Sequence, residues 1–123
     1  MNRYDPDLDL PAQAWLQLDE QEQINLVEQY HRVARITVPN AKLNAIIHTI
    51  VETQLAQQIP EVRRTFERLH SEGLDRHETI HAIGLVLANH MNSLLGRSNE
   101  SEDANSKYFA DLEALTAATW RAS

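Results

Sequence analysis

Residues 41–57, AKLNAIIHTIVETQLAQ, decide the fold because they predict a helix in the centre of the protein. Projected at about 100° per residue, the apolar side chains of this stretch cover more than half of the helix circumference. Such a helix is covered by other elements on most of its sides. The stretch therefore predicts an all-α bundle with this helix in the middle. The apolar residues that carry the argument are Leu43, Ile46, Ile47, Ile50, Val51 and Leu55.

Outward from this stretch, the chain predicts about four further helices. It has only 3 glycines and 4 prolines, which separate long helical patterns. Asp19 and Glu22 have the spacing of a capping box at a helix start. Pro60 suits the first turn of a helix, and Gly73 suits the position after a helix end. The expected helices cover residues 19–35, 41–58, 60–72, 76–95 and about 108–120.

A chain of 123 residues has the length of a single domain, since single cores typically span about 100–200 residues. We predict one helical domain over residues 1–123. Residues 1–18 are expected to form an extended, solvated N-terminal arm, in which Trp15 and Leu16 pack over the bundle. Residues 97–106 are polar and predict a mobile loop.

Composition excludes several classes of function. The formal net charge of −7 disfavours binding to nucleic acid or to an anionic membrane surface. The absence of cysteine excludes disulfides, thiol catalysis and thiolate metal sites. The sequence shows neither the apolar core of a signal peptide nor a membrane span. These observations predict a cytoplasmic protein, in which any metal is bound by nitrogen and oxygen.

Two ionisable residues stand out in the central helix. His48 and Glu52 are four residues apart and therefore share one face. Burial of a carboxylate without a partner costs several kcal/mol, so Glu52 requires a hydrogen-bonded cation or a metal. Taken alone, the pair is better explained as a hydrogen-bonded polar cluster in the core.

The helix predicted at residues 76–95 adds a second pair, because His77 and His81 are also four residues apart. If this helix packs against the central one, His48, Glu52, His77 and His81 converge as three nitrogens and one carboxylate. That set is a plausible ligand sphere for Fe, Zn, Mn or Ni. We predict one transition-metal ion at these four residues, with His31 as a weaker candidate ligand.

Residues 77–81, HETIH, also match the H-E-x-x-H motif of zinc metallopeptidases, in which the glutamate is the general base. Glu78 is thus a weak catalytic candidate. Its spacing from Asp75 equally predicts a capping box, and no strand is evident that would hold a peptide substrate. The peptidase hypothesis ranks below simple metal binding.

The Glu-x-x-His spacing of carboxylate-bridged di-iron bundles occurs three times. A site for one metal ion requires fewer residues to come together than a di-iron site does, so we favour a single ion. For His70 and His90 we predict local roles, with His70 near a helix C-terminus, where a cation is favourable. The three pairs are Glu28 with His31, Glu67 with His70, and Glu78 with His81.

The motifs His48-x-x-x-Glu52-x-Gln54-Leu55 and Asp75-x-His77-x-x-x-His81-Ala82 resemble a family of small bacterial helical proteins that is classed as a domain of unknown function. The resemblance covers residues 39–95. It implies a bacterial source and supplies no activity. The family pattern does not require an acidic residue at the position of Glu78, so the resemblance weakens the peptidase hypothesis and leaves the prediction of the four ligands unchanged.

Two functions remain after these exclusions. The first is a bacterial metal-binding bundle, which is a non-haem metalloenzyme if the ion keeps an exchangeable water and a structural site if its ligand shell is closed. The second is a metal-free interaction module or homodimer in which the His–Glu residues form a polar cluster. The sequence does not identify a small-molecule substrate.

Overall fold

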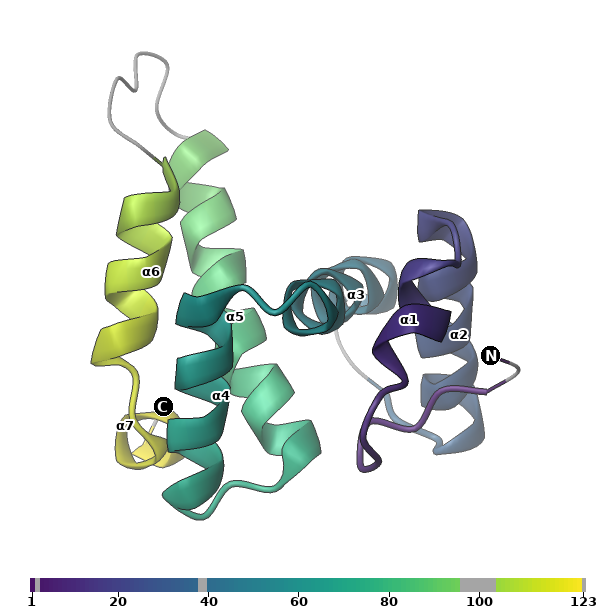
Figure 1. Ribbon diagram of the computed structural model, residues 1–123, viewed down its shortest axis with the longest axis horizontal. Coiled ribbons are helices and arrows are strands. Elements are labelled where there is room, and N and C mark those ends of the chain that lie inside the picture. The colour runs from purple at the N-terminus through teal and green to yellow at the C-terminus, as the bar shows by residue number, and fades with distance from the viewer. Residues whose placement is uncertain (2, 38–39, 96–103, 123) are drawn as a thin grey trace. The chain divides into compact units, whose positions relative to one another are not determined.

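The computed structural model describes residues 1, 3–37, 40–95 and 104–122, and these residues form seven helices and no strand. The all-α prediction is confirmed (Figure 1). No described helix combines the length and the apolar composition that a membrane span requires. The helices are α1 (Ala12–Leu16), α2 (Glu20–Val33), α3 (Ala41–Ala56), α4 (Pro60–Ser71), α5 (Arg76–Leu95), α6 (Ala104–Ala114) and α7 (Ala117–Ala122).

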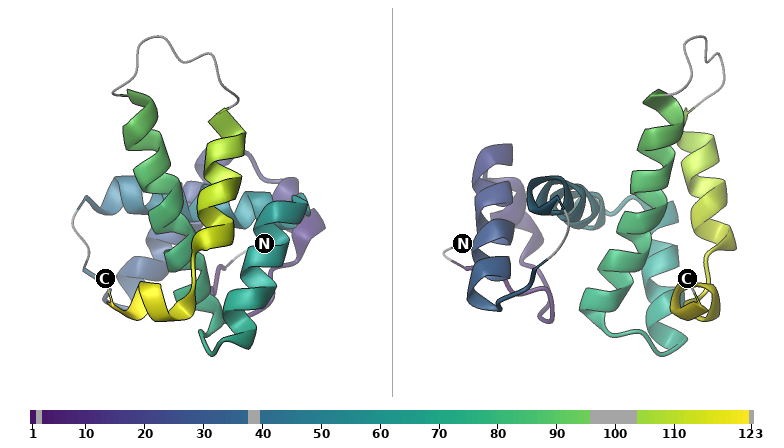
Figure 2. Two further views of the ribbon diagram at one scale, coloured as in Figure 1. Left: turned by 90° about the vertical axis from the view of Figure 1, so that its left-hand side faces the viewer. Right: turned by 180° about the vertical axis from the view of Figure 1, so that it is seen from behind.

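The chain divides into two compact units, Met1–Ile59 and Pro60–Ser123, called unit 1 and unit 2 below. In unit 1, α3 packs against both α1 and α2. In unit 2, α4, α5 and α6 pack against one another, and the views of Figure 2 show α5 and α6 side by side.

The helix starts of unit 1 follow the signals in the sequence. Asp19 accepts a hydrogen bond from the Glu22 backbone N–H at 2.8 Å and donates its own backbone N–H to Glu22 Oε1 at 3.1 Å. The predicted capping box is therefore present. Asn40 adopts a positive φ of 50° and accepts from the Leu43 N–H at 3.3 Å, which caps α3. As expected for a central helix, half of α3 is buried, including His48 and Glu52.

The first 18 residues differ from the predicted solvated arm. Tyr4 is 1 % exposed and Trp15 is 0 % exposed, so this segment contributes to the core of unit 1. It also contains α1, where Trp15 Nε1 donates to Thr53 Oγ1 at 3.1 Å and the Trp15 carbonyl accepts from Gln23 at 2.9 Å. Both aromatic rings bury a large apolar area, which outweighs the polarity of the neighbouring aspartates. The expected packing of Trp15 is confirmed, while Leu16 is 42 % exposed.

In unit 2, α4 begins at Pro60, as predicted, and ends before Gly73, whose φ of +107° suits glycine. The predicted mobile loop at residues 97–106 lies mainly outside the described residues, but residues 104–106 belong to α6. The single helix expected at about 108–120 is in fact two helices. Thr116 and Thr119 exchange backbone-to-hydroxyl hydrogen bonds of 3.1 and 3.0 Å, and this reciprocal cap starts α7.

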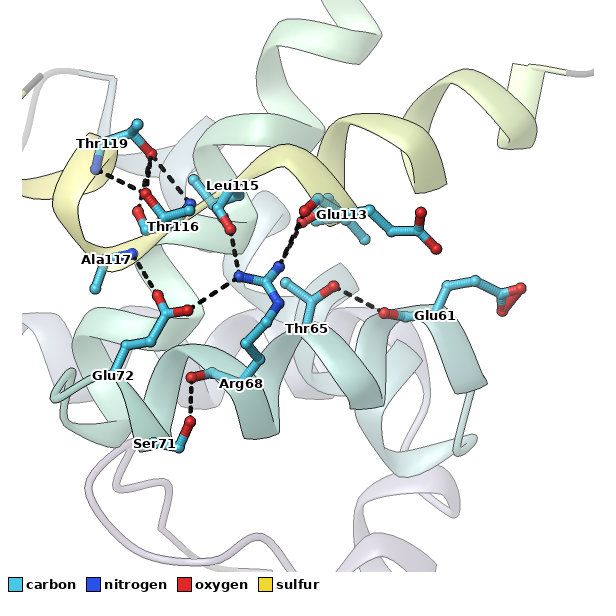
Figure 3. A network of polar contacts seen from close by, with 11 residues as sticks. Glu61, Thr65, Arg68, Ser71, Glu72, Glu113, Leu115, Thr116, Ala117 and Thr119 are labelled. Atoms are coloured by element: carbon cyan, nitrogen blue, oxygen red, sulfur yellow. Dashed lines mark hydrogen bonds and ion pairs between the residues drawn. The ribbon is translucent and has the colours of Figure 1, made fainter.

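The side chain of Arg68 in α4 joins three parts of unit 2 (Figure 3). Its guanidinium donates to the carbonyls of Leu112 at 3.0 Å and Leu115 at 2.6 Å, where α6 ends. A cation is favourable at a helix C-terminus. Arg68 also pairs with Glu72 at 3.4 Å, and Glu72 in turn accepts from the Ala117 N–H at 2.8 Å. Arg68 and Glu72 together thus connect α4, the end of α6 and the start of α7.

Arg68→Ala is expected to lower the free energy of unfolding by about 2 kcal/mol, because several charge-assisted hydrogen bonds are lost at once. Urea denaturation followed by circular dichroism measures the change. Arg63→Ala is the control, since Arg63 makes only an exposed pair with Glu67 at 3.2 Å, which contributes about 0.3–0.5 kcal/mol. Equal effects of the two variants would contradict the role assigned to Arg68.

Candidate metal centre

The core of unit 1 holds a polar group made of Tyr4, His48 and Glu52. Their side chains are buried, and Glu52 is 0 % exposed. The Tyr4 hydroxyl contacts His48 Nε2 at 2.6 Å and donates a hydrogen bond to Glu52 Oε2. The predicted pairing of His48 and Glu52 on one face of the central helix is therefore present, with a tyrosine hydroxyl touching both.

Packing fixes Tyr4 in this position. Its ring lies 5.7 Å from the ring of Trp15 and meets the ring of Tyr30 edge-on at 6.0 Å, measured between centroids. It also meets the His48 ring edge-on at 5.4 Å. These contacts hold the aromatic ring from several sides, so its hydroxyl has a defined place beside His48. Tyr4 was not predicted as a site residue, because a lone tyrosine in an acidic segment has no periodic pattern to mark it.

His31, the weaker candidate in the sequence, lies next to His48. It comes from the last turn of α2 and is 5 % exposed. The ring centroids of His31 and His48 are 5.8 Å apart, and each ring offers a nitrogen within 4.8 Å of the other. Two imidazoles from different helices thus approach closely enough to bind one ion. Unit 1 therefore supplies two candidate histidine ligands, His31 and His48.

The other two predicted ligands lie on α5 in unit 2. The rings of His77 and His81 are 4.3 Å apart between centroids and meet edge-on, and both side chains are partly buried. The prediction that these residues share a face of one helix is confirmed. The prediction that they bind the same ion as His48 and Glu52 combines residues of both units, and it stays a prediction.

Glu78 is exposed and caps α5. Its backbone N–H donates to Asp75 Oδ1 at 2.8 Å, while its carboxylate accepts from the Asp75 N–H at 3.4 Å. The predicted capping box is confirmed. The described part of the chain also contains no strand against which a peptide substrate could be held. Capping of α5 therefore accounts for the glutamate of the HETIH sequence without a catalytic role.

The remaining histidines, His70 and His90, make contacts within unit 2. His70 Nδ1 contacts the Leu74 carbonyl at 2.9 Å, just beyond the end of α4, and its ring stacks on Phe66. His90 is 8 % exposed and stacks on Tyr108 at 5.7 Å between centroids. These two residues serve as controls for any experiment on the others.

A pocket of about 240 Å³ lies in unit 1 beside Tyr4. Arg3, Asp5, Tyr30 and Val33 also line it. Comparison of the chain with protein-family models, curated proteins and solved structures finds no match.

Proposed function

We propose that this protein binds one divalent transition-metal ion (Fe, Zn, Mn or Ni) and that His31 and His48 are ligands in unit 1. The observation that carries the proposal is the approach of two buried imidazoles, with nitrogens within 4.8 Å of each other. In a tetrahedral site with metal–nitrogen distances of about 2.0–2.1 Å, two such nitrogens lie about 3.4 Å apart. The nitrogens of His31 and His48 would therefore need to approach each other by at most about 1.4 Å.

The burial of Glu52 supports the same proposal. Its carboxylate lies at the core of unit 1 with no exposed surface, where an ionised group loses the stabilisation of water. A divalent cation at the neighbouring imidazole of His48 would stabilise negative charge on this carboxylate. His77 and His81 keep the ligand role that their spacing predicts, and variants of these two residues test it separately.

The same hydrogen bonds favour the alternative function, a metal-free interaction module. Tyr4 contacts His48 and Glu52 together, so these groups form a hydrogen-bonded cluster that needs no ion. The two functions differ in one measurable property. A metal that binds only the folded state raises the melting temperature, whereas a metal-free cluster gives no such response.

The test is a titration of the chelator-treated, untagged full chain with Zn²⁺, Fe²⁺, Mn²⁺ and Ni²⁺ by calorimetry, followed by thermal unfolding. We expect saturation at one equivalent for at least one ion and a higher melting temperature in its presence. Affinity for that ion should fall at acidic pH, because protons compete for the imidazoles. If no ion binds at micromolar concentration, the metal-free module is the correct function.

A further inference from the structure

The Tyr4 hydroxyl has two partners but only one proton. It lies between His48 Nε2, at 2.6 Å, and Glu52 Oε2, to which it donates. A phenol hydroxyl donates one hydrogen bond and accepts others, whereas an ionised carboxylate only accepts. With the tyrosine proton directed to Glu52, the contact with His48 requires its hydrogen from the imidazole. In this arrangement Nε2 of His48 carries the proton.

We propose that Tyr4 and Glu52 together hold His48 in the Nε2–H tautomer, so that Nδ1 is the nitrogen that binds the metal. A neutral imidazole has one N–H, and protonation at Nε2 leaves the lone pair on Nδ1. This inference deepens the proposed function and rests on it for the metal. It also gives Glu52 a role different from the direct ligation that the sequence predicts, because the carboxylate acts through the tyrosine.

The arrangement matches the chemistry that imidazole ligands need. A histidine that binds a metal usually donates its second N–H to a carboxylate, a carbonyl or a water, which fixes the ring orientation and makes the bound nitrogen more basic. In the proposed arrangement the hydrogen bonds run from His48 to Tyr4 and from Tyr4 to Glu52, between atoms that the structure places in contact. Both hydrogen bonds lie in the buried core, where consecutive hydrogen bonds strengthen one another. Tyr4 is thus a positioning residue for His48.

The fold supports this role, since the tyrosine comes from a segment that the core of unit 1 holds in place. The Trp15 and Tyr30 rings pack against Tyr4, which is 1 % exposed. His48 and Glu52 come from adjacent turns of α3, so one rigid helix sets the spacing between the two partners of the hydroxyl.

The opposite arrangement of protons, with the Nδ1–H tautomer of His48, satisfies the same two contacts, and an experiment must distinguish it from the proposed one. A protonated Glu52 would donate to Tyr4, Tyr4 would donate to Nε2, and the imidazole proton would be on Nδ1.

Long-range ¹H–¹⁵N spectra of the chelator-treated full chain, labelled with ¹⁵N-histidine, separate the two tautomers. The resonances of His48 are those that disappear in His48→Ala. We expect a protonated Nε2 and an unprotonated Nδ1.

Tyr4→Phe keeps the ring and removes the hydroxyl. We expect the tautomer of His48 to become mixed and the metal affinity to fall about 10- to 100-fold, the usual effect of losing an outer hydrogen-bond partner. Tyr108→Phe, which alters a buried tyrosine of unit 2, controls for the loss of a hydroxyl and should leave both properties unchanged.

Three results would overturn the inference. They are an Nδ1–H tautomer in the unaltered protein, no change in tautomer or affinity in Tyr4→Phe, and a visible charge-transfer band with iron(III) that Tyr4→Phe removes, which would make the phenolate itself a ligand. Failure of the proposed function looks different. In that case no ion binds the unaltered chain, while the tautomer of His48 still reports the hydrogen bonds of Tyr4.

Discussion

His48→Ala should abolish stoichiometric metal binding. The imidazole of His48 contacts the Tyr4 hydroxyl, and its ring centroid lies 5.8 Å from that of His31. The variant loses a metal ligand, so the affinity for the metal should fall by more than the roughly 10- to 100-fold expected when a hydrogen-bond partner of a ligand, such as Tyr4, is removed. Calorimetric titration of the chelator-treated variant measures the loss. His31→Ala should have the same direction of effect.

Two controls make this result specific. His70→Ala removes an exposed histidine that contacts only local groups in the described structure, and it should bind metal as the unaltered protein does. Glu78→Gln tests the peptidase hypothesis and should also retain the ion, because Glu78 caps α5. His81→Ala tests the sequence-based prediction that this residue of α5 is a ligand, which loss of the ion would support. Full retention of metal by His48→Ala would refute the assignment of this site.

Trp15→Ala should destabilise unit 1 by about 3–5 kcal/mol, the usual cost of removing a buried tryptophan side chain. Trp15 is 0 % exposed, packs on the Tyr4 ring and donates a hydrogen bond to Thr53. The variant removes this apolar volume and leaves the threonine hydroxyl without its donor. Urea denaturation followed by circular dichroism measures the free energy of unfolding.

The control for Trp15→Ala is Leu8→Ala in the same N-terminal segment. Leu8 is 63 % exposed, so its truncation should change the free energy of unfolding by less than about 0.5 kcal/mol. Because Trp15 supports the Tyr4 ring, Trp15→Ala should also weaken metal binding at temperatures where the variant is folded. A destabilisation below about 1 kcal/mol would show that residues 1–18 are the solvated arm that their charge pattern suggests.

Most helices of the fold could be predicted from local signals. Capping boxes at Asp19 and Asp75, a proline at position 60 and a glycine at position 73 each act within a few residues of the boundary that they define. The N-terminal segment could not be predicted in this way. Tyr4 is buried by long-range contacts with Trp15 and His48, and such contacts leave no periodic pattern near residue 4.

The candidate site shows the same division between local and long-range information. The pairs His48 with Glu52 and His77 with His81 were recognisable because residues four apart share a helix face. The approach of His31 to His48 joins α2 to α3 and depends on how the two helices pack. The Tyr4 hydroxyl was missed for a further reason. Sequence patterns mark common metal ligands, whereas a residue that orients a ligand has no characteristic spacing.

Elemental analysis of the full chain, purified without an affinity tag and without added metal, tests the central claim most directly. The account predicts about one equivalent of a single transition metal in the unaltered protein and far less than one equivalent in His48→Ala. The same measurement identifies the metal. A content far below one equivalent in the unaltered protein, together with a melting temperature that chelator does not change, would contradict the account and would assign the buried His–Glu residues to a metal-free polar cluster.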